Sequence, residues 1–345
     1  MPVRDPVNVL IASPLEAEHV ARIEAADDRL RLLYAPDLLP VPRYQCDHTG
    51  VPRDLTAADA DRWARLREQA DVSLDFDWQD PAAMPKHCPH LRWVQGTSAG
   101  IGGFLERTGL VGSDLVFTTA AGVHATPLAE FALYGLLHFV KDMPALARWQ
   151  RQQHWQRHTS GVLAGSTAVV VGLGSIGREV CRLLSAVGVT VHGCGRPGRS
   201  YDVPGVSRYT DTSHLRELLP HASALILACP LTEQTAGLIG AAELAALPPG
   251  AVVVNVSRGA VIDEPALVSA LTSGHVGGAC LDVFATEPLP PSSPLWAMDS
   301  VIVSPHSAAT ATAENRLITD LFIDNLRRFM AGGPLRNVYD RVAGY

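Results

Sequence analysis

The chain has 345 residues, enough for two domains that each enclose a hydrophobic core. Apolar residues make up 47% of it and charged residues 18%, which is ordinary for a soluble globular protein. The formal charge of −7 and the lack of a Lys/Arg cluster argue against a nucleic-acid partner.

The sequence favours a cytoplasmic protein without a membrane partner. Its first apolar run, residues 7–12, is too short for a signal peptide and is followed at once by Pro14 and Glu16. The longest apolar helix, expected at 128–140, is too short to span a bilayer. The six cysteines form no C-x-x-C pair, so we expect reduced thiols that mostly act as small buried residues.

Residues 7–119 alternate short apolar runs with helical patterns. A long irregular connection is expected at 36–55, and Thr56 is a candidate N-cap for a helix at 57–70. Strands alternating with helices predict parallel βαβ units, so this part is a small α/β domain without a glycine fingerprint. The expected strands are residues 7–12, 30–35, 71–76, 91–96 and 115–119, with a helix at 15–26.

A helical region is expected from 127 to about 155, and a glycine-rich loop follows a buried strand at 168–171. Gly172, Gly174 and Gly177 form G-x-G-x-x-G directly before a helical pattern. The first glycine permits a tight turn, the second lets the backbone approach a pyrophosphate, and the third allows close helix–strand packing. With the helix N-terminus as an anion site, the stretch predicts dinucleotide binding.

Six parallel strands with helices between them predict a doubly wound sheet in this second part of the chain. A helix is expected at 178–188, directly after the glycine loop, and a long one at 311–333 near the C-terminus. The six strands are residues 168–171, 189–195, 224–229, 251–257, 277–284 and 300–305.

Four ionisable residues lie at the ends of three of these strands or directly after them: Arg258, then Asp282 and Glu287, then His306. Each alone has an ordinary explanation, as a solvated loop residue, a turn cap or a surface imidazole. Ligands of open α/β sheets bind beyond the carboxyl ends of the strands. The four together therefore predict a catalytic site at that edge.

Residues 255–308, from NVSRGAVIDEP to VIVSPHSA, resemble the signature region of the D-isomer-specific 2-hydroxyacid dehydrogenases. Residues 91–103, 121–133, 172–177, 229–240 and 334–340 resemble the same family, whereas 36–80 match only loosely. The resemblance implies two Rossmann-like domains with doubly wound parallel sheets and usually a homodimer. A nucleotide domain (122–306) would be inserted into a discontinuous, flavodoxin-like substrate domain (1–121 and 307–345).

The resemblance also implies roles for single residues. His306 would be the general acid that protonates the developing alkoxide, and Glu287 would stabilise its imidazolium. Arg258 would bind the substrate carboxylate and polarise the 2-oxo group. Asp282 would receive the nicotinamide carboxamide. Backbone N–H groups of Ser98, Ala99, Gly100 and Ile101 would hold the carboxylate. Further cofactor contacts would come from Ser175, Ile176, Cys229, Pro230, Thr235, Val256, Ser257, His306 and Ala308.

The second strand of the nucleotide domain departs from the NAD-preferring pattern. Such members carry an Asp at its end, where this chain has Gly195, followed by Arg196, Arg199 and Ser200. A missing carboxylate with nearby guanidinium groups suits a 2′-phosphate, so we expect NADP(H) to be preferred, with NAD(H) possible. The alternative is a Gly/Pro loop with incidental charge.

Two smaller signals leave alternatives open. Residues 86–90, KHCPH, could suggest a metal, but without a second ligand cluster a surface loop is expected and no metal is predicted. Trp149 and Trp155 follow the helical region. They could help shape a partner subunit's substrate pocket or anchor a dimer interface.

Together, the motifs and the resemblance predict an NAD(P)-dependent oxidoreductase that reduces a small 2-oxo acid, such as glyoxylate or hydroxypyruvate, to the D-2-hydroxy acid. A formate or phosphite dehydrogenase on the same scaffold is disfavoured because Glu287 is retained. A phosphoglycerate dehydrogenase remains open, although we expect no regulatory domain. A dinucleotide-sensing corepressor is the alternative outside enzymes.

Overall fold

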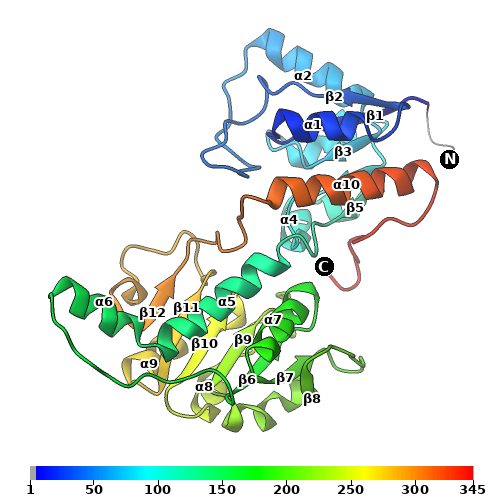
Figure 1. The fold of residues 1–345 in the computed structure, drawn as a ribbon. Coiled ribbons are helices and arrows are strands. Elements are labelled where there is room, and N and C mark those ends of the chain that lie inside the picture. Colours follow the sequence, from blue (N-terminus) through cyan, green and yellow to red (C-terminus); the bar gives the residue numbers. More distant parts are fainter. Residues whose placement is uncertain (1–4, 345) are drawn as a thin grey trace. The chain divides into compact units, whose positions relative to one another are not determined.

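The computed structural model describes residues 5–344 of the chain (Figure 1). It divides into two compact units, one formed by Met1–His124 and Thr310–Tyr345 and the other by Ala125–Ala309. The expected α/β fold is thus present, with the second unit inserted between the two segments of the first. In the described part of the chain, no helix has both the length and the apolar character needed to cross a membrane.

The first unit contains a parallel sheet of five strands in the order β2-β1-β3-β4-β5. This is the flavodoxin-like order, which confirms the expected fold. All five expected strands are present, each shorter than its apolar run. They are β1 (Val7–Ile11), β2 (Leu30–Leu33), β3 (Val72–Leu74), β4 (Trp93–Gln95) and β5 (Val116–Thr118).

Helices cover both faces of this sheet. Ile23 of α1 and Phe322 of α10 share one buried cluster, and Trp63 of α2 belongs to the other. Thr56 caps α2 as expected, because its hydroxyl accepts from Asp59 N, and the Asp59 carboxylate accepts from the backbone N–H and the hydroxyl of Thr56. The helices are α1 (Ala17–Glu24), α2 (Ala57–Gln69), α3 (Met84–His87), α4 (Gly102–Arg107) and α10 (Glu314–Met330), with short 3-10 turns at Pro81–Ala83 and Leu110–Gly112.

The second unit has seven parallel strands where six were predicted. The additional strand is β8 (Val206–Asp211), a mostly exposed edge strand. Its sequence, VSRYTD, lacks the apolar run that identified the others, so the prediction missed it. The order is β12-β11-β10-β9-β6-β7-β8, with β6 (Thr167–Val171), β7 (Thr190–Gly195), β9 (Ala224–Leu227), β10 (Ala251–Asn255), β11 (Val276–Leu281) and β12 (Val301–Val303).

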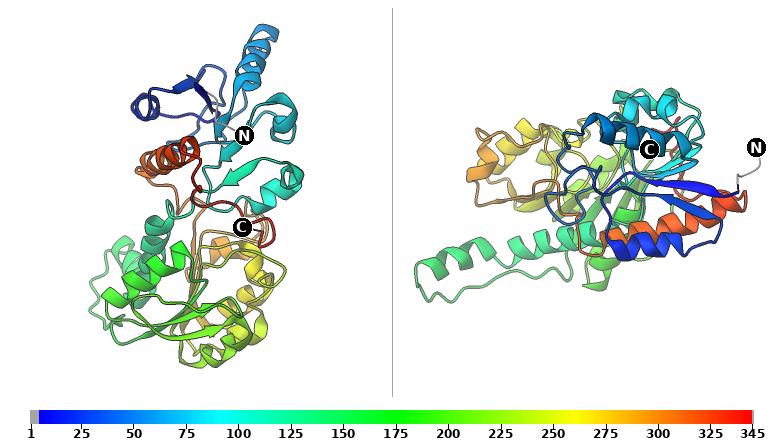
Figure 2. Two further views of the ribbon diagram at one scale, coloured as in Figure 1. Left: turned by 90° about the vertical axis from the view of Figure 1, so that its right-hand side faces the viewer. Right: turned by 90° about the horizontal axis from the view of Figure 1, so that it is seen from above.

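The helical region expected at 127–155 is two helices. The first, α5 (Ala125–Val140), packs its buried side chains on the core of the unit, and the second, α6 (Met143–Arg151), projects from the rest of the unit (Figure 2). The break lies at Asp142, whose φ of 52° is left-handed, and Pro144 then lies in the first turn of α6. The unit's other helices are α7 (Ser175–Ala186), α8 (Ala241–Ala246) and α9 (Glu264–Thr272), with 3-10 turns at Thr212–Glu217, Leu219–His221, Gly259–Val261 and Pro294–Ala297.

Candidate active site

The carboxyl ends of the seven strands form one edge of the second unit's sheet, because all of them run parallel. The strand order reverses between β6 and β9, the type of position at which such sheets bind dinucleotides. The predicted site residues of this unit follow the strands at this edge. They are Gly172–Gly177 after β6, Gly195–Ser200 at the end of β7, Cys229, Pro230 and Thr235 after β9, Val256–Arg258 after β10, Asp282 and Glu287 after β11, and His306 and Ala308 after β12.

The three glycines of the loop after β6 have different surroundings. Gly172 has a φ of 95°, and a Cβ there would lie 2.5 Å from Cys229 N. A Cβ on Gly177 would lie 1.8 Å from the carbonyl oxygen of Gly172, so α7 packs directly on the turn. Gly174 has nothing within 4 Å of its Cβ position and directly precedes α7. The loop thus offers open space where a phosphate would approach the helix N-terminus.

His306 and Glu287 form a hydrogen-bonded pair. Nδ1 of His306 lies 2.8 Å from Oε2 of Glu287, and the other carboxylate oxygen of Glu287 accepts from the backbone N–H of Phe284 at 3.0 Å. His306 has a φ of 54°, in a region sparsely populated by residues other than glycine. Such conformations occur mostly where surrounding contacts hold them, often at active sites.

Asp282 is bonded to the turn that carries His306. One of its carboxylate oxygens, Oδ1, accepts from Ser304 Oγ at 2.6 Å and from the backbone N–H groups of Ser307 and Ala308 at 2.9 Å each. Burial raises the pKa of Asp282, while these hydrogen bonds and the charge of His306 act in the opposite direction. The carboxylate therefore orders residues 304–308. Its predicted contact with a carboxamide stays a prediction.

Arg258 lies directly after β10 on a loop braced by two neighbours that the sequence analysis did not single out. Asn255 accepts from Ser257 N at 3.0 Å and Oγ at 2.7 Å, and its amide donates to Arg258 O at 3.1 Å. A Cβ on Gly259 would lie 1.9 Å from the carbonyl carbon of Phe284. Only glycine fits this approach, so the Arg258 loop packs against the segment that leads to Glu287.

The environment of Arg258 contains opposite charges. Burial lowers the pKa of its guanidinium, and the carboxylates of Glu287 and Asp282 oppose that effect. Nη1 donates to Ser257 O at 2.7 Å. The carboxylates of Glu287 and Asp282 thus stabilise the charged form of the Arg258 guanidinium.

The end of β7 contains one residue that sequence reasoning overlooked. Arg196, Arg199 and Ser200 are exposed in the loop after the strand, and their predicted contact with a 2′-phosphate stays a prediction. Tyr201 lies against Gly195, where a Cβ would be 2.1 Å from its Cε2. Its hydroxyl accepts from the backbone N–H of Arg196 at 3.0 Å. The one sequence signal for Tyr201 is that it is the aromatic residue in a loop that is otherwise rich in Gly, Pro and Arg.

The remaining predicted residues belong to the first unit. Ser98–Ile101 lie between β4 and α4, with Ser98 and Gly100 exposed and Ile101 buried. Their predicted contact with a substrate carboxylate stays a prediction. In the KHCPH stretch, His87 Nδ1 pairs with Arg67 Nη1 at 3.2 Å, and burial raises the pKa of Cys88 to about 12. Residues 5–344 contain no group of three His, Cys, Asp or Glu that could hold a metal ion.

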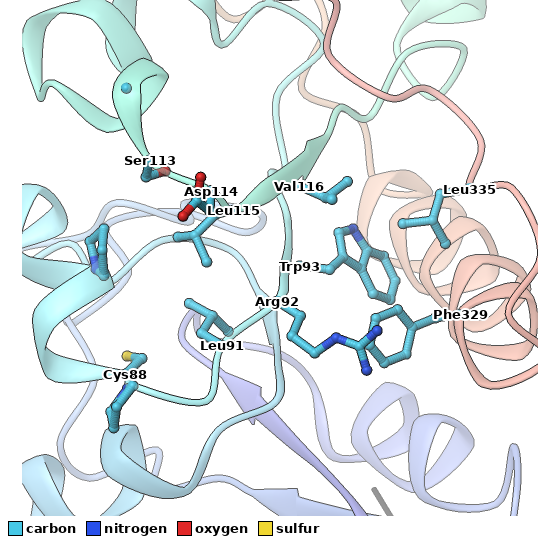
Figure 3. A pocket seen from close by; sticks show the side chains of 13 residues that line it. Cys88, Leu91, Arg92, Trp93, Ser113, Asp114, Leu115, Val116, Phe329 and Leu335 are labelled. Carbon is cyan, nitrogen blue, oxygen red and sulfur yellow. The ribbon is translucent and has the colours of Figure 1, made fainter. Parts of the chain in front are cut away.

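A surface groove in the first unit is separate from these residues (Figure 3). It lies at the amino-terminal ends of β4 and β5, opposite the edge that carries Ser98–Ile101. The Arg92 guanidinium lies 5.0 Å from the centre of the Phe329 ring in its wall. None of the predicted site residues lines it.

Comparisons with known proteins identify relatives of this chain. Residues 133–308 match the model of the D-isomer specific 2-hydroxyacid dehydrogenase, NAD binding domain. Over 294 residues the chain is 31% identical to glyoxylate/hydroxypyruvate reductase A of Salmonella heidelberg, covering 82% of this chain and 92% of that protein. Over 224 residues it is 38% identical to D-3-phosphoglycerate dehydrogenase of Mycobacterium bovis, covering 63% of this chain but 41% of that protein.

A solved structure shares the whole fold. The D-isomer specific 2-hydroxyacid dehydrogenase from Xanthobacter autotrophicus, crystallised with NADPH and MES, is 32% identical, with a TM-score of 0.79 and coverage of 99% of this chain and 100% of that one. The match extends over both units and over the strand ends described above. The chain therefore belongs to the D-isomer specific 2-hydroxyacid dehydrogenase family and is an NAD(P)-dependent oxidoreductase acting on CH–OH groups.

Proposed function

We propose that this enzyme reduces a small 2-oxo acid, of the size of glyoxylate or hydroxypyruvate, to the D-2-hydroxy acid. The observation that carries the proposal is the His306–Glu287 pair, located at the same sheet edge as Arg258 and the glycine loop. An acid, its anionic partner and a fixed cation are the groups that reduction of a 2-oxo acid requires.

The residues at this edge fit a dinucleotide. Gly174 leaves room for a pyrophosphate at the start of α7. At Gly172 and Gly177, backbone atoms occupy the space that a Cβ would need, as the fingerprint requires. Gly172–Gly177, Cys229, Pro230, Thr235, Val256 and Ser257 would hold the cofactor. The bound nicotinamide supplies the hydride.

The chain's own residues supply binding and proton transfer. Because Nδ1 of His306 is engaged by Glu287, Nε2 is the ring nitrogen that would donate the proton to the alkoxide. Glu287 would keep the imidazolium oriented and stabilised. Arg258 would bind the carboxylate and polarise the 2-oxo group through its planar donors. Backbone N–H groups of Ser98–Ile101 would complete carboxylate binding.

We expect NADPH to be the preferred reductant, and the support is the loop after β7. Gly195 brings no carboxylate to the strand end, and Arg196 and Arg199 are exposed next to it. The relative from Xanthobacter autotrophicus was crystallised with NADPH. If Arg196→Ala left the ratio of kcat/KM for NADPH and NADH unchanged, the preference would have another origin.

We also propose that the enzyme is a homodimer. Apolar side chains are exposed on and after the two extended helices: Tyr134, Leu137, Met143, Leu146 and Trp155, the last 92% exposed. Trp149 makes an edge-to-face contact with His158, with the ring centres 5.1 Å apart. Light scattering of the wild type and of Trp155→Ala tests whether this surface joins two copies.

We also propose a reducing, cytoplasmic location, because none of the six thiols is paired with another.

The test of the proposed function is a substrate panel with the purified protein. Glyoxylate, hydroxypyruvate, pyruvate and a larger 2-oxo acid are compared with NADPH and NADH, with 3-phosphoglycerate oxidation as the competing activity. We expect reduction of at least one small 2-oxo acid, with NADPH favoured. Dinucleotide binding without turnover of any of these would support the sensor alternative. Turnover confined to 3-phosphoglycerate would replace the proposed substrate class.

A further inference from the structure

Tyr201 occupies the space that a side chain at position 195 would need. Gly195 is the last residue of β7, and a Cβ there would lie 2.1 Å from Cε2 and 2.7 Å from Cζ of the Tyr201 ring. The ring also packs against the buried cluster beneath the sheet. With the Tyr201 ring in this position there is no room for a side chain at the end of β7, so a carboxylate could enter only if the ring moved.

Tyr201 is also bonded to the residue that would meet a phosphate. Its hydroxyl accepts from the backbone N–H of Arg196 at 3.0 Å, where the chain leaves β7. This bond fixes the direction in which the backbone departs and hence the origin of the Arg196 side chain. The same residue therefore excludes an anion at position 195 and orders the cation beside it.

The loop that carries Tyr201 is anchored on its far side. Arg178 of α7 donates to Asp202 O at 2.8 Å. The Tyr209 hydroxyl donates to Val203 O at 2.8 Å and accepts from Val203 N at 2.6 Å. The two residues that follow Tyr201 are thus fixed by hydrogen bonds, and they help to hold its ring against Gly195.

We propose that Tyr201 determines dinucleotide selectivity as a positioning residue. It excludes from the end of β7 the carboxylate that would bind a ribose 2′-hydroxyl, and it holds the Arg196 backbone so that its guanidinium is presented to a 2′-phosphate. The inference rests on the proposed preference for NADPH. It adds that an acidic residue at position 195 is not enough to reverse the preference, because the Tyr201 ring fills the space beside it.

Binding of nucleotide fragments tests both parts without catalysis. The dissociation constants of 2′,5′-ADP and 5′-AMP are measured by calorimetry for the wild type, Tyr201→Phe, Gly195→Asp and the double variant Gly195→Asp/Tyr201→Ala. Tyr209→Phe is the matched control, because it removes hydroxyl bonds to the same loop at Val203 instead of Arg196. Thermal unfolding checks that each variant is folded.

We expect Tyr201→Phe to raise the dissociation constant of 2′,5′-ADP about five- to tenfold, which is the size of one lost hydrogen bond. The dissociation constant of 5′-AMP should change by no more than about twofold. Tyr209→Phe should not change the ratio of the two constants. Gly195→Asp alone should not improve 5′-AMP binding, whereas the double variant should improve it about tenfold over the single one, the size of one hydrogen bond to a charged group.

Two results would overturn the inference. One is Gly195→Asp binding 5′-AMP as tightly as the double variant does. The other is Tyr201→Phe leaving the ratio of the two constants unchanged. If the wild type shows no preference for 2′,5′-ADP, the NADPH proposal fails. The exclusion of a carboxylate at position 195 is still decided in that case by the single and double variants.

Discussion

His306 and Glu287 are joined by a 2.8 Å hydrogen bond between Nδ1 and Oε2, although 19 residues separate them in the chain. The bond leaves Nε2 of the imidazole for proton exchange. Glu287 is itself fixed by the backbone N–H of Phe284, so the imidazole is oriented by a carboxylate that is already anchored. This is the arrangement expected of a general acid held ready for transfer.

Replacing Glu287 by Gln tests the value of its charge. Glutamine can still accept from Nδ1 but cannot stabilise an imidazolium electrostatically. We expect kcat for 2-oxo acid reduction to fall at least about tenfold, with KM changed much less. Steady-state kinetics check this. The control is Asp211→Asn, which alters a surface imidazole–carboxylate pair, His214 with Asp211 at 3.1 Å, and should leave both constants unchanged.

A methyl group on Gly259 should disturb the site through the backbone. The Cβ of Gly259→Ala would lie 1.9 Å from the carbonyl carbon of Phe284, so the Arg258 loop or the Phe284 segment must move. We expect a loss of about 1–3 kcal/mol in stability and a raised KM for the 2-oxo acid. Gly112→Ala is the matched control, because nothing lies within 4 Å of its Cβ position. Equal behaviour of the two variants would contradict the packing argument.

The carboxylate of Asp282 should be needed for the order of the His306 turn. Asp282→Ala leaves Ser304 Oγ and the N–H groups of Ser307 and Ala308 without their acceptor, which costs about 1–3 kcal/mol. Asp282→Asn keeps an acceptor oxygen there and should be milder in urea unfolding. We expect kcat to follow the same order, lowest in the alanine variant. An asparagine variant as damaging as the alanine variant would mean that the charge, not the hydrogen bonds, is required.

A buried carboxylate in the first unit should make stability depend on acid. Glu314 lies between His124 and His48, with Oε1 at 3.4 and 3.5 Å from their Nε2 atoms. Burial alone would raise the pKa of Glu314, but the two histidines outweigh it and lower that pKa to about 2. Because the folded-state pKa lies below the ordinary 4.5, this stabilisation is complete above about pH 4.5 and is lost as pH falls toward 2.

Glu314→Gln is therefore expected to be less stable at pH 6, by about 2–3 kcal/mol, and to lose less stability on acidification. Urea unfolding between pH 3 and pH 7 measures both effects. Glu18→Gln, on the exposed side of α1, serves as the control. Parallel stability curves for wild type and Glu314→Gln over this range would show that the carboxylate does not carry the acid dependence.

The features that sequence reasoning identified correctly are those with local causes. The different roles of Gly172, Gly174 and Gly177 could be predicted because each is a requirement on backbone space within one turn. The parallel strands followed from their buried apolar runs. The edge strand β8 has no such run and was missed. The break at Asp142 was also missed, although Pro144 is a local signal for it.

Contacts between distant segments could not be predicted in this way. The bonds from Asp282 to the turn at 304–308, and the packing of Tyr201 on Gly195, depend on where loops end after the sheet has formed. No periodicity or spacing encodes those positions. The residues of the predicted constellation were named from the sequence, whereas the neighbours that hold them in place, such as Asn255 and Gly259, came from the structure.

The most direct test of the account is the rate of NADPH oxidation with glyoxylate or hydroxypyruvate in the wild type and in His306→Ala. His214→Ala, at the exposed surface pair, is the control. We expect kcat to fall about 10²- to 10⁴-fold in His306→Ala, with the melting temperature nearly unchanged, and the control to behave as wild type. A His306→Ala enzyme that kept a tenth or more of the wild-type kcat would contradict the assignment of His306 as the proton donor.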